Sequence, residues 1–191
     1  MKRLDLLNIS DQAQAVSIVL PLIEKAPELA KKVASRRPFP TAEHLALAIR
    51  QELLGLNEAD RIDLFRTHPE LAPDNPFEMT NESQREQGRL NLTSNNNAYR
   101  ERLSDLNKRY TAKFGFPFIT ALVRHQTMDS VLDEFERRLL RDRQSEIETA
   151  VDQIATVSAS RVAATFECES AASGLERSQG QANRDTRRDK L

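Results

Sequence analysis

The sequence is poor in the residue types that most often carry binding chemistry. Its 191 residues include one cysteine, three histidines and no tryptophan. The lone Cys168 excludes an intrachain disulfide and a thiolate metal cluster, and it gives no sign of an oxidising compartment. The histidines, His44, His68 and His125, fall in separate segments, so no metal site is predicted. Acid–base chemistry in this chain therefore has few residues that could carry it.

The chain also lacks an excess of charge of either sign and any long apolar run. Its 28 basic and 29 acidic residues nearly cancel, which argues against a basic face for nucleic acid. The longest apolar stretches, such as residues 16–23, are too short to cross a membrane, and Pro21 interrupts that one. The N-terminus has no long apolar core of a secretory signal. We therefore expect a soluble cytoplasmic protein with no nucleic-acid partner and no membrane partner.

The last three residues, Asp-Lys-Leu, are close to a peroxisomal address. Asp189 is large and acidic where that signal has a small residue, so a peroxisomal location is less favoured.

The apolar residues repeat with a helical period almost throughout, and no alternating strand pattern competes. The sequence therefore predicts an all-α fold, a single-domain bundle of about seven to nine helices spanning residues 1–166. We expect Ser10, Thr41, Asn57 and Thr127 to begin helices and Gly115 to end one. The helix that begins near Asn57 should stop at His68, because a residue before proline is disfavoured in helical geometry. Residues 167–191 have almost no apolar side chains and are predicted to be a disordered tail.

Four features could carry chemistry, and each also has a purely structural interpretation. His68, at a predicted helix end, could simply satisfy terminal carbonyls, which is the commoner role for such a histidine. Ser83 and Glu86 have the spacing of a capping box. Arg161 lies on the apolar stripe of the last helix, where an internal salt bridge and an anionic ligand are equally good explanations. The segment from Phe114 to Ile119 could be only a core-filling turn.

These features occur in the order and spacing of a known family. Together they resemble 2-oxo-4-hydroxy-4-carboxy-5-ureidoimidazoline (OHCU) decarboxylase over roughly residues 10–166. The resemblance rests on five motifs: Arg36-Arg37-Pro38-Phe39, Phe65-x-x-His68-Pro69-Glu70-Leu71, Ser83-x-x-Glu86-Gln87, the run from Leu106 to Ile119, and the final Glu-Ile...Ala...Ile...Arg161 pattern.

The resemblance implies an all-helical, homodimeric enzyme without a cofactor. Such an enzyme acts last in the conversion of urate to (S)-allantoin, on an anionic ureidoimidazoline. It implies that His68 and Glu86 form the catalytic pair and that Arg161 lies in the site. The residues implied to line the substrate pocket are Pro69, Ser83, Gln84, Arg85, Glu86, Gln87, Ile119, Thr120, Ala121, Leu122 and Val123.

The chemistry of that reaction agrees with the missing metal and cofactor motifs. Conjugated carbonyl and imine groups of the substrate can accept the electron pair left by CO₂, so the protein need supply only orientation, charge stabilisation and a proton. Two alternatives stay open. A non-catalytic helical interaction module would have Arg161 paired internally and no pocket joining it to His68. The other alternative is a relative of the family that acts on another ureide or hydantoin-like acid. It stays open because the segment 119–124 is one residue longer than usual.

Overall fold

The structure, a computed structural model, describes residues 3–93 and 99–166, and the only regular elements in this part of the chain are helices. Nine α-helices and three short 3₁₀ helices follow one another in these residues, which confirms the predicted all-α class. Cys168 and the predicted tail lie outside the described residues. The α-helices are α1 (Arg3–Ile9), α2 (Gln12–Val19), α3 (Pro27–Ala34), α4 (Ala42–Leu54), α5 (Glu58–Arg66), α6 (Asn81–Gly88), α7 (Arg100–Phe114), α8 (Met128–Leu139) and α9 (Arg143–Phe166), and the 3₁₀ helices are η1 (Leu20–Leu22), η2 (Pro76–Glu78) and η3 (Leu122–Arg124).

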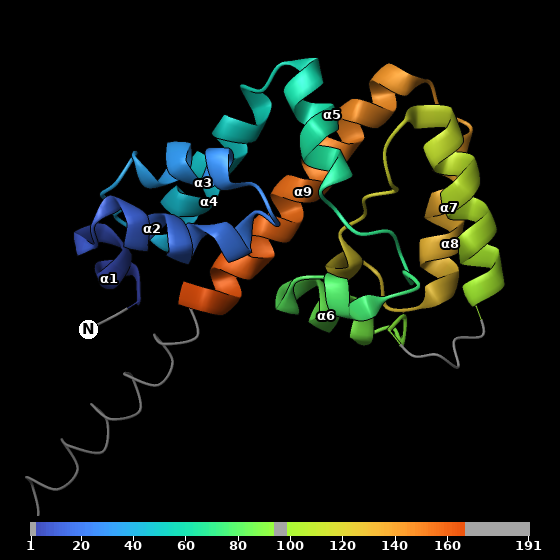
Figure 1. Ribbon diagram of the computed structural model, residues 1–191, viewed down its shortest axis with the longest axis horizontal. Coiled ribbons are helices and arrows are strands. Elements are labelled where there is room, and N and C mark those ends of the chain that lie inside the picture. The colour runs from blue at the N-terminus through green and yellow to red at the C-terminus, as the bar shows by residue number, and fades with distance from the viewer. Residues whose placement is uncertain (1–2, 94–98, 167–191) are drawn as a thin grey trace, which may run out of the picture.

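The long helix α9 runs through the middle of the molecule. Figure 1 shows α1 to α4 on one side of it and α6 to α8 on the other, with α5 next to its upper part. Along its 24 residues α9 contacts α1, η1, α4, α5 and η3, so it joins both halves. A side chain on α9 can therefore meet residues from distant parts of the sequence.

Most of the predicted helix ends are confirmed. Thr41, Asn57 and Thr127 are N-caps whose side chains accept a backbone N–H from the first turn, and Gly115 ends α7 with a left-handed φ of 83°. The prediction for Ser10 was wrong. Asp11 caps α2 instead, since its side chain accepts the Gln14 amide at 2.8 Å, and the Ser10 hydroxyl donates to the Leu6 carbonyl of α1 at 2.7 Å.

Two further local predictions were wrong in ways that matter for the site. Helix α5 ends at Arg66, two residues before His68, with Thr67 as the C-cap. Ser83 does not cap α6, because Thr80 is the N-cap and accepts the Ser83 amide. The Ser83 hydroxyl is therefore free to bond elsewhere in the fold.

Aromatic rings form the core beside the site. Tyr110, Phe114 and Phe116 are buried, and Phe118 stacks on Phe135 with ring centroids 3.8 Å apart. The turn after α7 thus fills the core, as its structural interpretation predicted. It also fixes the position of the chain that follows Phe118.

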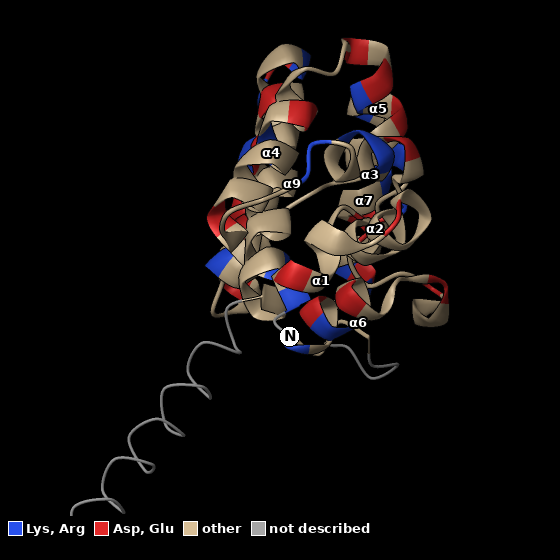
Figure 2. Cartoon of the chain, turned by 90° about the vertical axis from the view of Figure 1, so that its left-hand side faces the viewer, with Lys and Arg blue, Asp and Glu red and all other residues tan. Residues whose placement is uncertain are grey.

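Outside the core, charges of both signs are interspersed along the helices (Figure 2). Within the described residues, no helix has the length and apolar character needed to cross a membrane.

Candidate functional site

A small cavity lies where α6, α9 and two irregular segments meet. Its volume is about 50 Å³, enough for one or two water molecules. The walls come from the loop after α5, from α6, from residues 118–122 and from α9. The lining residues are His68, Pro69, Leu71, Ser83, Glu86, Gln87, Phe118, Ile119, Thr120, Leu122, Ile154, Val157 and Arg161.

His68 reaches the cavity from the turn that follows α5. Its backbone N–H donates to the Phe65 carbonyl at 3.1 Å, and its Nδ1 lies 3.1 Å from the Leu64 carbonyl. A carbonyl can only accept, so Nδ1 carries the hydrogen and Nε2 is the nitrogen left to exchange a proton. Burial lowers the pKa of His68, and the Leu64 bond and the Glu24 charge oppose that shift only in part. The imidazole therefore rests neutral near pH 7.

The chain after His68 is held in place by Gln87 of α6. The Gln87 amide accepts the Ala72 N–H at 2.9 Å and donates to the Glu70 carbonyl at 2.9 Å. Gln87 is itself only 3% exposed. These bonds fix the loop that carries Pro69 and His68 against the helix that carries Glu86.

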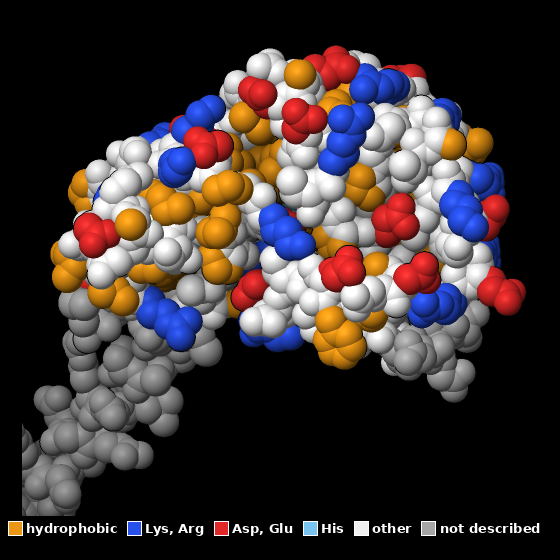
Figure 3. All heavy atoms as spheres, viewed as in Figure 1, with side chains coloured by type: hydrophobic (Ala, Val, Ile, Leu, Met, Phe, Trp, Pro, Cys, Tyr) orange, Lys and Arg blue, Asp and Glu red, His pale blue; other side chains and the backbone are white. Residues whose placement is uncertain are grey.

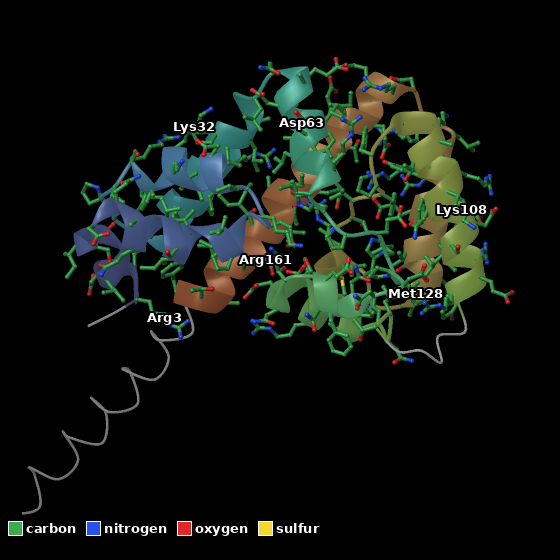
Figure 4. The ribbon with its side chains drawn as sticks, viewed as in Figure 1. Arg3, Lys32, Asp63, Lys108, Met128 and Arg161 are labelled. Atoms are coloured by element: carbon green, nitrogen blue, oxygen red, sulfur yellow. The ribbon has the colours of Figure 1, made fainter. Side chains whose placement is uncertain are left out.

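Arg161 projects from α9 toward α6, as Figure 4 shows. Its Nε and Nη2 donate to the two oxygens of Glu86 at 2.7 and 2.8 Å, a two-bond fork. The Nη1 group donates to the Pro21 carbonyl at 3.1 Å and to Glu24 at 3.0 Å, and Nη2 also donates to Ser83 at 3.2 Å. The internal salt bridge anticipated for Arg161 is therefore present.

Glu24 is a part of this cluster that sequence reasoning missed. It follows η1 with a φ of 51° and is 1% exposed. Its carboxylate accepts the hydroxyls of Thr80 and Ser83, the latter at 2.8 Å, in addition to Arg161. Burial alone would raise the pKa of Glu24, but the Ser83 bond and the Arg161 charge hold it below its usual value. No sequence motif marks this position.

A second buried network supports the wall formed by residues 118–122. Arg138, 1% exposed, donates to the Ile119 carbonyl at 2.8 Å and to Glu134 at 2.9 Å. Glu134 accepts the Thr120 hydroxyl at 3.0 Å, and Gln153 of α9 accepts the Ala121 N–H at 2.8 Å. The wall opposite His68 is thus fixed by side chains of α8 and α9.

The structure brings most, but not all, of the predicted site residues to this cavity. His68, Pro69, Ser83, Glu86, Gln87, Ile119, Thr120, Leu122 and Arg161 line it. Four do not: Gln84 and Arg85 line a surface hollow with Pro76 and Phe77, Ala121 is buried behind the wall, and Val123 is 58% exposed. Successive side chains of a helix or a 3₁₀ turn point in different directions around its axis, so a continuous run of residues cannot all face one cavity.

Leu71, Ile154 and Val157 complete the lining, together with Phe118, and were not among the predicted site residues. The apolar helical periodicity of α9 is the only sequence feature that could have indicated Ile154 and Val157 as lining residues.

The interaction-module alternative made two predictions about this region. Arg161 is paired internally, as it requires, but the cavity joins Arg161 to His68, which it does not allow. Across the described residues, no group of three or more His, Cys, Asp or Glu side chains could hold a metal ion.

The fold and site define an all-α protein in which a histidine, a carboxylate and an arginine from three separate elements share one cavity. The OHCU decarboxylase family model matches residues 8–163. The chain belongs to this family.

Individual relatives agree with this assignment. The chain is 35% identical over 153 residues to the OHCU decarboxylase of Mus musculus, covering 79% of this chain and 85% of that protein. It is 32% identical over 156 residues to the OHCU decarboxylase of Halalkalicoccus jeotgali, covering 82% and 87%. A solved structure of OHCU decarboxylase in the presence of (S)-allantoin has the same fold, with a TM-score of 0.64, 21% identity and coverage of 83% and 99%.

Proposed function

We propose that this protein decarboxylates 2-oxo-4-hydroxy-4-carboxy-5-ureidoimidazoline and forms (S)-allantoin in urate degradation. One observation carries the proposal: in a chain of the OHCU decarboxylase family, His68, Glu86 and Arg161 converge on one cavity. The substrate's own conjugated ring accepts the electron pair released with CO₂, so the reaction requires neither a metal nor an organic cofactor. The side chains must then bind an anion, orient it and provide one proton.

Each of the three side chains has a role that its surroundings favour. Arg161 offers a planar fork matched to a carboxylate or to the charge that develops on a ring carbonyl. His68, with Nδ1 fixed on the Leu64 carbonyl, can exchange a proton through Nε2. Glu86 is bonded to Arg161 and lines the same cavity as His68, where it can accept a hydrogen bond from the substrate hydroxyl. Catalysis thus rests on placement and charge rather than on a strong base.

The arrangement of the cavity also explains why the product would be a single enantiomer. Apolar residues Phe118, Leu122 and Ile154 form other parts of the cavity wall, and none of them can donate a proton. The planar intermediate would therefore be protonated only from the face that His68 approaches.

The test is the decay of freshly generated substrate, followed by circular dichroism in a buffer that contains EDTA. Wild-type protein should accelerate the decay and give one enantiomer, because spontaneous decay gives racemic allantoin. His68→Asn and Glu86→Gln preserve approximate shape and should each lower the rate about 10²-fold or more. A control variant, Glu28→Gln, removes a carboxylate that is exposed and paired with Lys31 at 2.7 Å, and it should keep the wild-type rate.

Two results would contradict the proposal. A wild-type protein that neither accelerates the decay nor biases its handedness does not have this activity. If the wild type does both but the His68 and Glu86 variants match it, the site has been assigned to the wrong residues.

We further propose that the protein is a homodimer, as the resemblance implies, and that it is cytoplasmic, as its composition predicts. Large apolar side chains are exposed on α1 and α4, among them Ile9 at 70% and Leu47 at 51%. Figure 3 shows apolar side chains gathered over this half of the molecule. Such surfaces favour association, and light scattering on the purified full chain measures the resulting mass directly.

A further inference from the structure

Arg161 has no free hydrogen-bond donor. A guanidinium carries five N–H groups. Those of Arg161 go to Glu86, twice, and to Glu24, Ser83 and the Pro21 carbonyl. A substrate carboxylate can bind Arg161 only by displacing one of these partners.

The two carboxylates on Arg161 differ in how easily they can be displaced. Glu24 is 1% exposed and is also held by the hydroxyls of Thr80, the N-cap of α6, and Ser83. The Glu86 side chain is 34% exposed, and all its hydrogen bonds go to Arg161. Glu86 is therefore the exchangeable partner and Glu24 the fixed one.

The Glu86–Arg161 pair also separates two spaces. Both residues line the inner cavity and an outer groove of about 430 Å³ that includes Pro21 and Ser160. The inner cavity holds one or two waters, which is less than the volume of a ring with its substituents. Moving Glu86 off Arg161 would both free the guanidinium fork and join the cavity to the groove.

The inner site carries one more negative charge than positive charge, and this excess disfavours the binding of an anion. Around the single guanidinium of Arg161 stand two carboxylates, Glu24 and Glu86, and the imidazole of His68 is neutral. Other charged side chains line the outer groove: Arg85 and Glu82, which pair with each other at 3.1 Å, and Arg3. A substrate carboxylate that takes the place of Glu86 on Arg161 leaves the displaced Glu86 beside the site without its counter-charge, which is unfavourable. A proton taken up by a neighbouring group removes that cost.

We infer that Glu24 is a positioning residue that fixes Arg161 and sets the charge of the site. The substrate's carboxylate then enters the site together with one proton. The proposed catalytic pair, His68 and Glu86, holds that proton. This inference rests on the proposed function. Nε2 of His68 is the vacant position for that proton, because Nδ1 is bonded to the Leu64 carbonyl.

The proton taken up with the substrate is the proton that the decarboxylation consumes. The bond between the ring carbon and the carboxylate breaks, CO₂ leaves, and the electron pair stays in the ring. The proton then forms the new C–H bond and His68 returns to its neutral state. Decarboxylation of an anion consumes one proton, and this mechanism delivers it with the substrate.

Two stable ligands separate the effect of the carboxylate from that of the ring. Oxonate is a ring with a carboxylate, and (S)-allantoin is a ring without one. Calorimetric titration of each at pH 7.5, in two buffers of different ionisation enthalpy, gives the protons taken up. Wild-type protein should take up about one proton with oxonate and nearly none with (S)-allantoin. The dissociation constant for oxonate should rise toward about tenfold per pH unit as the pH increases.

Variants test the part played by Glu24. Glu24→Gln keeps the shape but removes the charge, so proton uptake with oxonate should fall below about half and the pH dependence should flatten. Glu24→Asp keeps the charge and should keep the uptake. Should Glu24→Gln not fold, Glu86→Gln removes the other carboxylate and should reduce the uptake equally. Glu28→Gln, the exposed control, should behave as the wild type.

Several outcomes would overturn the inference. These are oxonate binding without proton uptake in the wild type, undiminished uptake in a folded Glu24→Gln, and failure of oxonate to bind or to compete with substrate at any pH. Turnover of the ureidoimidazoline to one enantiomer is measured separately. A protein that turns over the substrate but takes up no proton retains the proposed function and loses only this inference, whereas one without turnover loses the proposed function whatever its ligand binding shows.

Discussion

At the scale of single residues, the site depends on the hydrogen bonds and ion pairs that buried polar side chains make with one another. Ser83 shows this most simply, because it donates to Glu24 and accepts from Arg161 while only 5% exposed. Buried groups of this kind are stable when each has a partner and costly when one is removed. His68 is different, since burial favours its neutral form and leaves Nε2 available for chemistry.

The lowered pKa of His68 makes a prediction about acid stability. A histidine whose pKa is lower in the folded state stabilises the fold above its ordinary value of 6.5, and this stabilisation is lost as the pH falls below that value. His68→Asn does not titrate, so its melting temperature should fall less than that of the wild type between about pH 7.5 and 5.5. Thermal melting followed by circular dichroism across this range measures the difference. His44→Asn, a change at an exposed histidine, should keep the wild-type slope, and an equal slope in all three proteins would contradict the prediction.

At the scale of the elements, the turns that follow two helices place part of the site. The turn after α5 presents His68, and the turn after α7 leads through Gly115 to the wall that starts at Phe118. Arg66 also donates to the Gly115 carbonyl at 3.2 Å, so these two turns are joined. A helix end that shifts would move part of the cavity wall with it.

Gly115 gives a direct test of this dependence. Its φ of 83° is unfavourable for a side chain although a Cβ there would meet nothing within 4 Å. Gly115→Ala should therefore destabilise the protein by about 1 to 2 kcal/mol through backbone strain alone. Gly55→Ala is the matched control, because Gly55 is also a C-cap but has an ordinary φ of −75°. Urea unfolding should show a change below about 1 kcal/mol for Gly55→Ala, and equal losses in the two variants would contradict the account.

At the scale of the whole molecule, α9 connects the parts. It carries Gln153 behind the wall, Ile154 and Val157 in the cavity, and Arg161 at the boundary with the outer groove. All these contacts precede the end of the helix at Phe166, and the family match ends at residue 163.

A chain shortened to residues 1–166 should therefore keep its activity and its helicity per remaining core residue. The removed residues 167–191 have almost no apolar side chains with which to bury surface. The measurement compares melting temperature and the rate of substrate decay in the full and shortened proteins. A large loss of either would mean that this segment docks on the helical domain.

The sequence by itself determined the helical class, most helix ends and the identity of most of the residues that line the cavity. Thr41, Asn57 and Gly115 act within one turn of the chain, so local physics decides their roles. Only the tertiary structure decided that Glu24 shares Arg161 with Glu86, because those two partners are 137 and 75 residues away in the sequence. Ser83 illustrates the same limit, since its spacing from Glu86 favours a cap while the approach of Glu24 makes it a buried donor. Desolvated ion pairs depend on which distant segments pack together, and no local pattern specifies that.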